Sequence, residues 1–168
     1  MTHPPNPLVA GVSSLYDLLV WIGNHLQSPI LLFMRIVWGG QLIQAGVGKL
    51  MHIDKPIGYF TDLHIPFPVE NAWLVASTET FGGLFLALGL LSRLTCLPLI
   101  INFIVAYITT EQEGLKDLLN FDTGKFTADA AFPFLATAVV VLIFGPGAFS
   151  LDYLISRRRS KAWKSAGL

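Results

Sequence analysis

Four long apolar stretches constrain this chain more than any other feature. They cover residues 29–51, 69–91, 93–110 and 127–145. A helix that crosses a bilayer needs about 20 consecutive, mostly apolar residues, so each stretch is expected to span a membrane. Only one residue separates the second stretch from the third, which requires a tight helical hairpin. The sequence therefore predicts an all-α integral membrane protein built as a four-helix bundle.

The composition agrees with a membrane protein and excludes several other classes. Hydrophobic residues make up 53% of the chain and charged residues 13%, whereas soluble domains carry roughly 25% charge. Eleven basic and eleven acidic residues give a formal net charge of zero, which argues against nucleic acid as a partner. The single cysteine, Cys96, excludes an internal disulfide, a CxxC redox pair and a zinc knuckle. Membrane lipids are the expected surroundings.

The segment before the first apolar stretch divides into a tail and an amphipathic helix. Residues 1–12 contain several prolines and are expected to be irregular. Residues 13–28 place leucine and isoleucine at helical spacing, with Asp17 and Asn24 on the opposite side. This stretch is too short and too polar to span. We expect it to lie in the membrane interface as an N-terminal amphipathic helix; the alternative is a soluble helix packed on a partner.

The basic residues predict the orientation of the chain. Arginines and lysines crowd the C-terminal tail, and Arg93 lies in the short hairpin. Four crossings put these segments on one side, which the positive-inside rule makes the cytoplasmic side of a bacterial or archaeal inner membrane. Both termini are then cytoplasmic, and the loops 52–68 and 111–126 face outward. The expected domains are a tail and interfacial helix (1–28), a four-span membrane domain (29–155) and a basic cytoplasmic tail (156–168).

Polar residues inside the apolar stretches are candidates for a functional site, because charges at membrane depth are costly and are usually turned inward. Glu79, Gln41 and Asn102 each lie about ten residues from the end of a different stretch. At about 1.5 Å per residue, all three fall roughly 15 Å deep, near the midplane. Lys49 lies near the outer face and Arg35 nearer the cytoplasm, both long enough to reach the headgroups.

Such a layer allows two interpretations. A carboxyl at the midplane can hold or pass a proton, carboxamides can donate to a carbonyl oxygen such as that of a quinone, and Lys49 can anchor an anion or a headgroup. Alternatively, Glu79, Gln41 and Asn102 only hydrogen-bond one another across the bundle. Arg35 and Arg93 are interpreted as topology anchors. Glycines in the first two stretches, among them Gly82 and Gly83, favour close helix packing.

A series of short motifs resembles the DoxX/DoxD family of small four-span membrane proteins. Each motif is short, but their order and spacing match the family over residues 30–155. Two positions depart from the pattern: His64 stands where the family often has glycine, and Ala148 where an arginine is frequent. The motifs are Arg35…Gly39-Gly40…Ala45-Gly46-xx-Lys49-Leu50, Phe60 with Ile65-Pro66-x-Pro68, Glu79-xx-Gly82-Gly83, Leu88-Gly89-Leu90-Leu91-Ser92-Arg93 with Pro98-Leu99, and Gly145-Pro146-Gly147 with Ser150-Leu151-Asp152.

The resemblance implies the fold more strongly than the activity. DoxD-like members resemble the membrane subunit of a thiosulfate:quinone oxidoreductase, and other members resemble components of membrane oxidoreductase assemblies with soluble redox partners. Quinone is therefore the candidate small molecule. No covalently bound cofactor is expected: no histidine lies in an apolar stretch to ligate haem. His52 and His64 share the first outer loop, but their spacing matches no tight metal site.

Three classes of function remain open. The first is a subunit of a quinone-linked redox complex, in which the polar layer binds the quinone head or relays its protons while a partner supplies electrons. The second is a non-catalytic accessory subunit packed into a larger membrane complex. The third is a small-molecule carrier, ranked last because no pair of broken helices and no inverted repeat is evident. The sequence assigns no catalytic residue.

Overall fold

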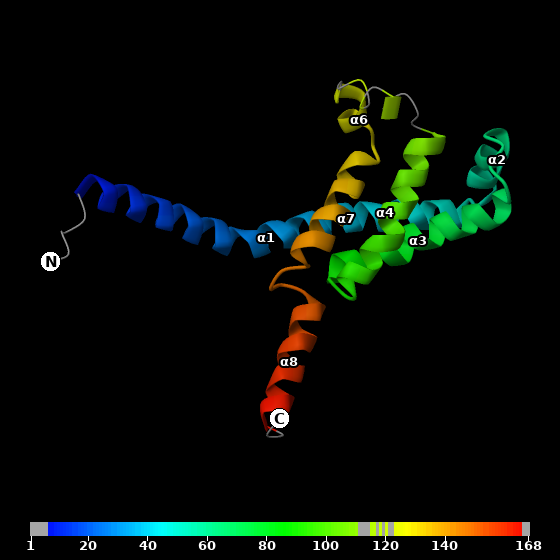
Figure 1. Ribbon diagram of the computed structural model, residues 1–168. Helices are drawn as coiled ribbons and strands as arrows, with labels where there is room; N and C mark the ends of the chain where they lie inside the picture. Colours follow the sequence, from blue (N-terminus) through cyan, green and yellow to red (C-terminus); the bar gives the residue numbers. More distant parts are fainter. Residues whose placement is uncertain (1–6, 111–114, 117, 119, 121–122, 166–168) are drawn as a thin grey trace.

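The computed structural model describes residues 7–110, 115–116, 118, 120 and 123–165 (Figure 1). Every regular element in these residues is helical, which confirms the all-α prediction. Two of the helices, Leu15–Met51 within α1 and Ser92–Thr109, are long and apolar enough to cross a membrane. The elements are α1 (Pro7–Met51), α2 (Asp54–Asp62), α3 (Pro68–Leu88), α4 (Ser92–Thr109), α6 (Gly124–Ala128), α7 (Phe132–Phe144) and α8 (Leu151–Ser165).

The first helix differs from the prediction at its beginning. Helix α1 has 45 residues and continues through Pro29, where a new helix was expected to begin. The expected irregular tail is also wrong for residues 7–12, which are helical; residues 1–6 lie outside the described part. At about 1.5 Å per residue α1 is about 67 Å long. Its first half projects from the rest of the molecule (Figure 1), and residues 15–27 are exposed. The expected boundary between two helices at residue 28 does not exist.

Helices α1 and α3 pack against each other as an antiparallel pair, and glycines set their register. A Cβ atom on Gly83 would lie 2.8 Å from the carbonyl oxygen of Gly39, and one on Gly46 would lie 2.5 Å from the backbone nitrogen of Thr80. The two backbones therefore touch where no side chain intervenes, as small residues allow in membrane helices. Gly82 instead faces α4, where a Cβ would lie 2.8 Å from Leu99. The expected packing role of Gly82 and Gly83 agrees with these contacts.

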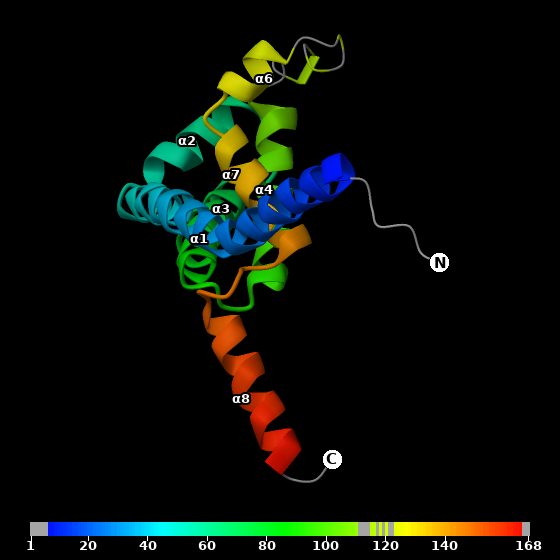
Figure 2. The same cartoon turned by 90° about the vertical axis from the view of Figure 1, so that its left-hand side faces the viewer.

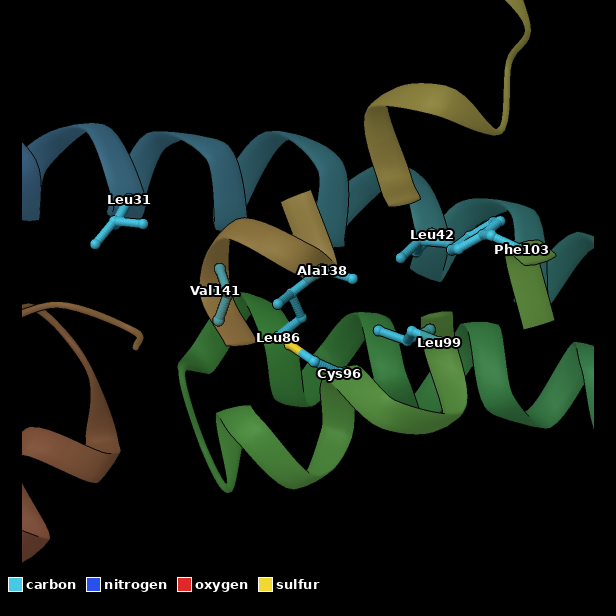
Figure 3. Packing of buried hydrophobic residues seen from close by; sticks show 8 residues of the cluster. All are labelled: Leu31, Leu42, Leu86, Cys96, Leu99, Phe103, Ala138 and Val141. Atoms are coloured by element: carbon cyan, nitrogen blue, oxygen red, sulfur yellow. The ribbon is translucent and has the colours of Figure 1, made fainter. Parts of the chain in front are cut away.

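Helices α4 and α7 form a second pair, which stands across the first (Figures 1 and 2). One end of each of the four helices borders a single cavity: α1 and α4 end near it, and α3 and α7 begin near it. We call this the α2 end, and the opposite end, where α3 turns into α4, the α8 end. The core lies between the two pairs (Figure 3) and consists of Leu31, Leu42, Leu86, Cys96, Leu99, Phe103, Ala138 and Val141.

The fourth apolar stretch is not one continuous helix. It was predicted to run over 127–145, but α7 has only 13 residues and is separated from the five-residue α6. An irregular segment, 145–150, follows α7, and α8 then continues below it in Figures 1 and 2. The predicted end at residue 145 agrees with the end of α7, whereas the break between α6 and α7 and the helix over most of the predicted C-terminal tail were not anticipated. Two predicted outer loops also contain helices, namely α2 and part of α6.

Candidate functional site

A cavity of about 900 Å³ opens at the α2 end, between the two helix pairs and beneath α2. Residues of α1 and α3 form one wall, residues of α4 and α7 form the wall across from it, and α2 with the segment that follows it forms the rim. Most of the lining is aliphatic or aromatic, and a few polar groups interrupt it. The polar lining residues are Lys49, Lys55, His64, Asn71, Glu79, Asn102, Thr109, Thr110 and Asp129.

An ion pair between Lys49 and Glu79 forms the polar part of the cavity wall. The Lys49 Nζ donates to both carboxylate oxygens of Glu79, at 2.5 and 2.6 Å. The Glu79 side chain is 6% exposed, whereas that of Lys49 is 37% exposed. The carboxylate therefore depends on Lys49 for its counter-charge, while the ammonium group still reaches open space. Lys49 does not extend toward headgroups, as the sequence analysis had allowed, but turns inward onto Glu79.

The register of α1 on α3 explains this pairing. Gly46 lies opposite Thr80 and Gly39 opposite Ala87, so Glu79 lies opposite the turn that contains Lys49. Counting inward from the expected helix ends had placed Gln41 at that level instead. The contacts of Gly39 with Gly83 and Ala87, and of Gly46 with Ala76 and Thr80, put Glu79 level with about residue 45 of α1. The real register therefore differs by about four residues, roughly 6 Å along the helix. The difference arises because α3 extends past the end of α1 and carries the α2 segment on its first turns.

The structure brings together three of the four predicted site residues. Asn102 of α4 lines the same cavity as Lys49 and Glu79. It is partly buried, and within the described residues its carboxamide makes no hydrogen bond. Gln41 lies on an exposed face of α1 and does not line the cavity. One residue corresponds to a turn of 100°, so its neighbour Leu42, not Gln41, faces the core.

The rim of the cavity contains a strained segment that sequence reasoning had not assigned to the site. His64 and Phe67 adopt left-handed backbone conformations, with φ of 55° and 51°. Such values are uncommon for residues other than glycine, and at His64 they explain why glycine suits this position in the family pattern. His64 lines the cavity together with Phe60, whereas the side chain of Phe67 is 73% exposed. Of the aromatic residues in this region, Phe60 faces the cavity and Phe67 does not.

Arg35 occupies a second charged position, at the α8 end, and is fully buried. Its Nη2 donates to the Phe149 carbonyl at 2.5 Å, and its Nε donates to the Leu31 carbonyl at 3.4 Å. Gly89 leaves space for the guanidinium, because a Cβ there would collide with Nη1. The prediction of an anchor that reaches the headgroups is wrong for Arg35, whose charge is enclosed. Arg93 is exposed, and its anchoring role stays a prediction.

Asp152, at the start of α8, completes the contacts at this end. Its two carboxylate oxygens accept the backbone N–H groups of Leu91 and Ser92, each at 2.8 Å. Its own N–H donates to the Gly89 carbonyl at 2.9 Å. This carboxylate caps the N-terminus of α4 and fixes the turn between α3 and α4. The sequence Gly89-xx-Ser92…Asp152 contained these residues but gave no sign that they meet.

The two charged positions permit different chemistry. At the α2 end an ammonium group, a carboxylate and an unpaired carboxamide face a largely apolar space, so a ligand with a polar head and an apolar body fits there. At the α8 end Arg35 and Asp152 hydrogen-bond to backbone groups, and Nη1 of Arg35 is buried without a hydrogen-bond partner among the described residues. Within the described residues, no three histidine, cysteine or acidic side chains lie close enough to hold a metal ion.

Comparison with known proteins places this chain among membrane proteins. The family model DoxX matches residues 30–112, which include α2, α3, α4 and the second half of α1. An uncharacterized membrane protein of Mycobacterium tuberculosis is 29% identical over 136 residues, with 77% of this chain and 83% of that protein covered. No solved structure matches the chain. The matched segment contains Lys49, Glu79 and Asn102.

Proposed function

The protein belongs to the DoxX family of membrane proteins, and from this premise we propose that it is the membrane subunit of a quinone-linked redox complex. In this proposal the cavity at the α2 end holds the head of a quinone. A partner subunit, membrane-bound or soluble, carries the electron-transferring cofactor. Helix exteriors face lipid, in keeping with the many exposed leucines, isoleucines and phenylalanines on α1, α3 and α4.

The observation that carries the proposal is the Lys49–Glu79 pair in the wall of an amphiphilic cavity. Ligand pockets commonly have volumes of about 300–1,000 Å³ and few polar groups, and the cavity of about 900 Å³ fits this description. The ammonium group of Lys49 and the amide of Asn102 are both donors suited to the two-oxygen head of a quinone. Phe60, Phe103 and Phe134 offer flat apolar surfaces to its ring.

The chemistry balances with one partner. Reduction of a quinone to a quinol takes two electrons and two protons. The electrons come from the partner's redox centre, and the protons come from water by way of Glu79, which accepts and releases one proton at a time. Lys49 stabilises the carboxylate form between transfers and holds it at the ligand. This chain therefore binds the quinone and handles its protons, and the partner performs the electron transfer.

Measurement of co-purified quinone tests the proposal. The full chain is purified from native membranes in a mild detergent, and quinone is extracted and quantified per protein. We expect a stoichiometric amount in the wild type and a loss of at least fivefold in Glu79→Gln, which keeps the side-chain volume but removes the proton. Glu70→Gln is the matched control, because Glu70 is an exposed carboxyl on the same helix and does not line the cavity.

The accessory-subunit alternative predicts a different result. In that case Glu79→Gln retains wild-type quinone content and complex activity, while Glu79→Leu reduces assembly with the partner because Lys49 loses its counter-charge. Equal quinone content in the wild type and in both glutamine variants would remove the chemical role and favour the alternative. The one specific observation in favour of the alternative is the long exposed first half of α1, which offers a helix surface for packing.

The location proposed for the chain is the inner membrane of a bacterium or archaeon, with several crossings and both termini in the cytoplasm. The alternation of the four helix ends supports an even number of crossings, and the basic residues of α8 support the orientation. A cysteine introduced at Asp54 should react with an impermeant thiol reagent in intact cells, with Cys96 replaced by alanine. Reaction of a cysteine at Ser160 instead would invert the orientation.

A further inference from the structure

The interruption between α7 and α8 leaves irregular backbone close to the membrane. Helix α7 is about 20 Å long by its residue count, shorter than the roughly 30 Å of a bilayer core. Segment 145–150 and the apolar first turns of α8 extend the path in the same direction (Figures 1 and 2). Irregular backbone at such a depth needs hydrogen-bond partners from the protein. Arg35 and Ser28 supply two of them, to Phe149 and Ala148.

A second cavity, of about 650 Å³, lies beside this interruption. The start of α4 forms one side, and segment 145–150 with the start of α8 forms the other. It is separate from the quinone cavity proposed above, and the two cavities share no lining residue. Its polar lining residues are Ser92, Arg93, Ser150, Asp152, Tyr153 and Ser156.

Arg93 gives this cavity a cation that the fold does not use. The side chain lies across from segment 145–150, where its Nη2 would be 3.8 Å from a Cβ on Gly145. Arg93 is exposed, and within the described residues its guanidinium makes no hydrogen bond and no ion pair. Among the described residues no ion pair joins Arg93 to the neighbouring carboxylate of Asp152, whose two oxygens accept the N–H groups of Leu91 and Ser92.

Ser92 points independently to a missing ligand. It is fully buried and lines the cavity, yet its hydroxyl makes no hydrogen bond within the described residues. Buried hydroxyls nearly always have a partner. The N–H groups of Arg93 and Leu94 follow in the same first turn of α4, where backbone donors have no acceptor within the helix. An acceptor with several oxygens would satisfy this set of donors.

We propose that this cavity binds the phosphate of an anionic phospholipid from the leaflet at the α8 end. Arg93 supplies the charge, and Ser92 with the first turn of α4 supplies further donors to the phosphate oxygens. The exposed apolar residues beside the cavity, Leu91, Leu94 and Phe144, lie where the acyl chains leave the headgroup. The three consecutive arginines of α8, Arg157–Arg159, raise the local concentration of anionic lipid but do not line the cavity.

Lipid retention by the purified full chain tests the site. Delipidated protein in detergent is titrated with phosphatidylglycerol, with phosphatidylcholine of the same chain length, and with inorganic phosphate, and bound lipid is counted by native mass spectrometry. We expect one tightly bound phosphatidylglycerol. Arg93→Gln should weaken its binding by at least tenfold, and Ser92→Ala by about threefold, since both remove direct donors.

Arg159→Gln is the matched control, because it removes the same charge at the same end without touching the cavity. A basic residue that only attracts anionic lipid to a surface accounts for roughly fivefold at most. Equal losses in Arg93→Gln and Arg159→Gln would therefore mean diffuse attraction and would overturn the site. Equal retention of phosphatidylcholine, or inorganic phosphate binding as tightly as the lipid, would overturn the assignment to an anionic phospholipid. Wild-type binding of phosphatidylglycerol by both Ser92→Ala and Arg93→Gln would also overturn the site.

Discussion

The ion pair at the α2 end and the enclosed Arg35 at the α8 end use charged side chains in opposite ways. At the α2 end, Lys49 and Glu79 pair with each other and border a cavity of about 900 Å³. At the α8 end, Arg35 is enclosed and donates to main-chain carbonyls. A charge that borders space remains available to a ligand, whereas a charge surrounded by backbone fixes the fold. The depth of a charged residue in an apolar helix does not show whether it binds a ligand or stabilises the fold. The groups that its side chain contacts do show this.

The most severe change we predict is Gly89→Ala. The new Cβ would collide with Nη1 of Arg35 and lie 2.6 Å from Ser150 Cβ, and φ at this residue is +66°. Overpacking and left-handed strain together should lower stability by about 3 kcal/mol. Thermal unfolding in detergent measures the loss. Gly40→Ala serves as the control, because no heavy atom lies within 4 Å of its Cβ position, and it should be neutral or slightly stabilising.

Arg35→Met should destabilise the α8 end by about 2 kcal/mol, since it leaves the partly buried Phe149 carbonyl without its donor. Arg93→Met removes the same charge from an exposed position and should change stability by less than about 0.5 kcal/mol in lipid-free detergent. Urea or thermal unfolding of both variants compares an enclosed arginine with an exposed one. Similar losses in the two would show that total charge matters at this end, and not the enclosure of Arg35.

The sequence predicted most helices, because apolar stretches of sufficient length depend only on local composition. It also identified Lys49, Glu79 and Asn102 as unusual residues for such helices. The sequence did not predict correctly which residues of neighbouring helices lie at the same level. Gln41 was placed opposite Glu79 by counting from the expected ends, but the contact between Gly46 and Thr80 sets another register. Close backbone packing is a tertiary property, and glycine spacing alone allows several registers.

The α8 end was missed for a related reason. Its contacts join residues far apart in sequence, such as Ser28 with Ala148 and Leu91 with Asp152. The periodicity of apolar residues along a sequence does not indicate which distant residues contact each other. Gly145-Pro146-Gly147 did mark a boundary, because glycine with proline breaks helices, and the predicted end of the fourth stretch at residue 145 agrees with the end of α7 at Phe144. The residues after this tripeptide were not recognised as the start of another helix, α8.

A double-mutant cycle sharpens the comparison at the α2 end. Lys49→Met leaves the Glu79 carboxylate without its partner in a side chain that is 6% exposed, whereas Glu79→Leu leaves the Lys49 ammonium group unpaired in a side chain that is 37% exposed. We therefore expect Lys49→Met to cost about 2 kcal/mol and Glu79→Leu about 1 kcal/mol. The double variant should be more stable than the sum of the two losses implies, with a coupling energy of about 1 kcal/mol. Strictly additive losses would show that the two groups do not interact in the membrane.

The smallest effect on stability is expected from replacing Asn102 or Gln41, the two carboxamides that the sequence analysis placed at the same depth. Asn102→Leu and Gln41→Leu each replace an amide without a buried hydrogen bond, so each should shift stability by less than about 0.5 kcal/mol. Their effects on ligand should differ, because Asn102 lines the cavity and Gln41 lies on an exposed face. Quinone content measured after purification should fall several-fold in Asn102→Leu alone. A matching fall in Gln41→Leu would mean that the ligand occupies the outer face of α1, and the contrast between an open and an enclosed charged position would then no longer locate the binding site.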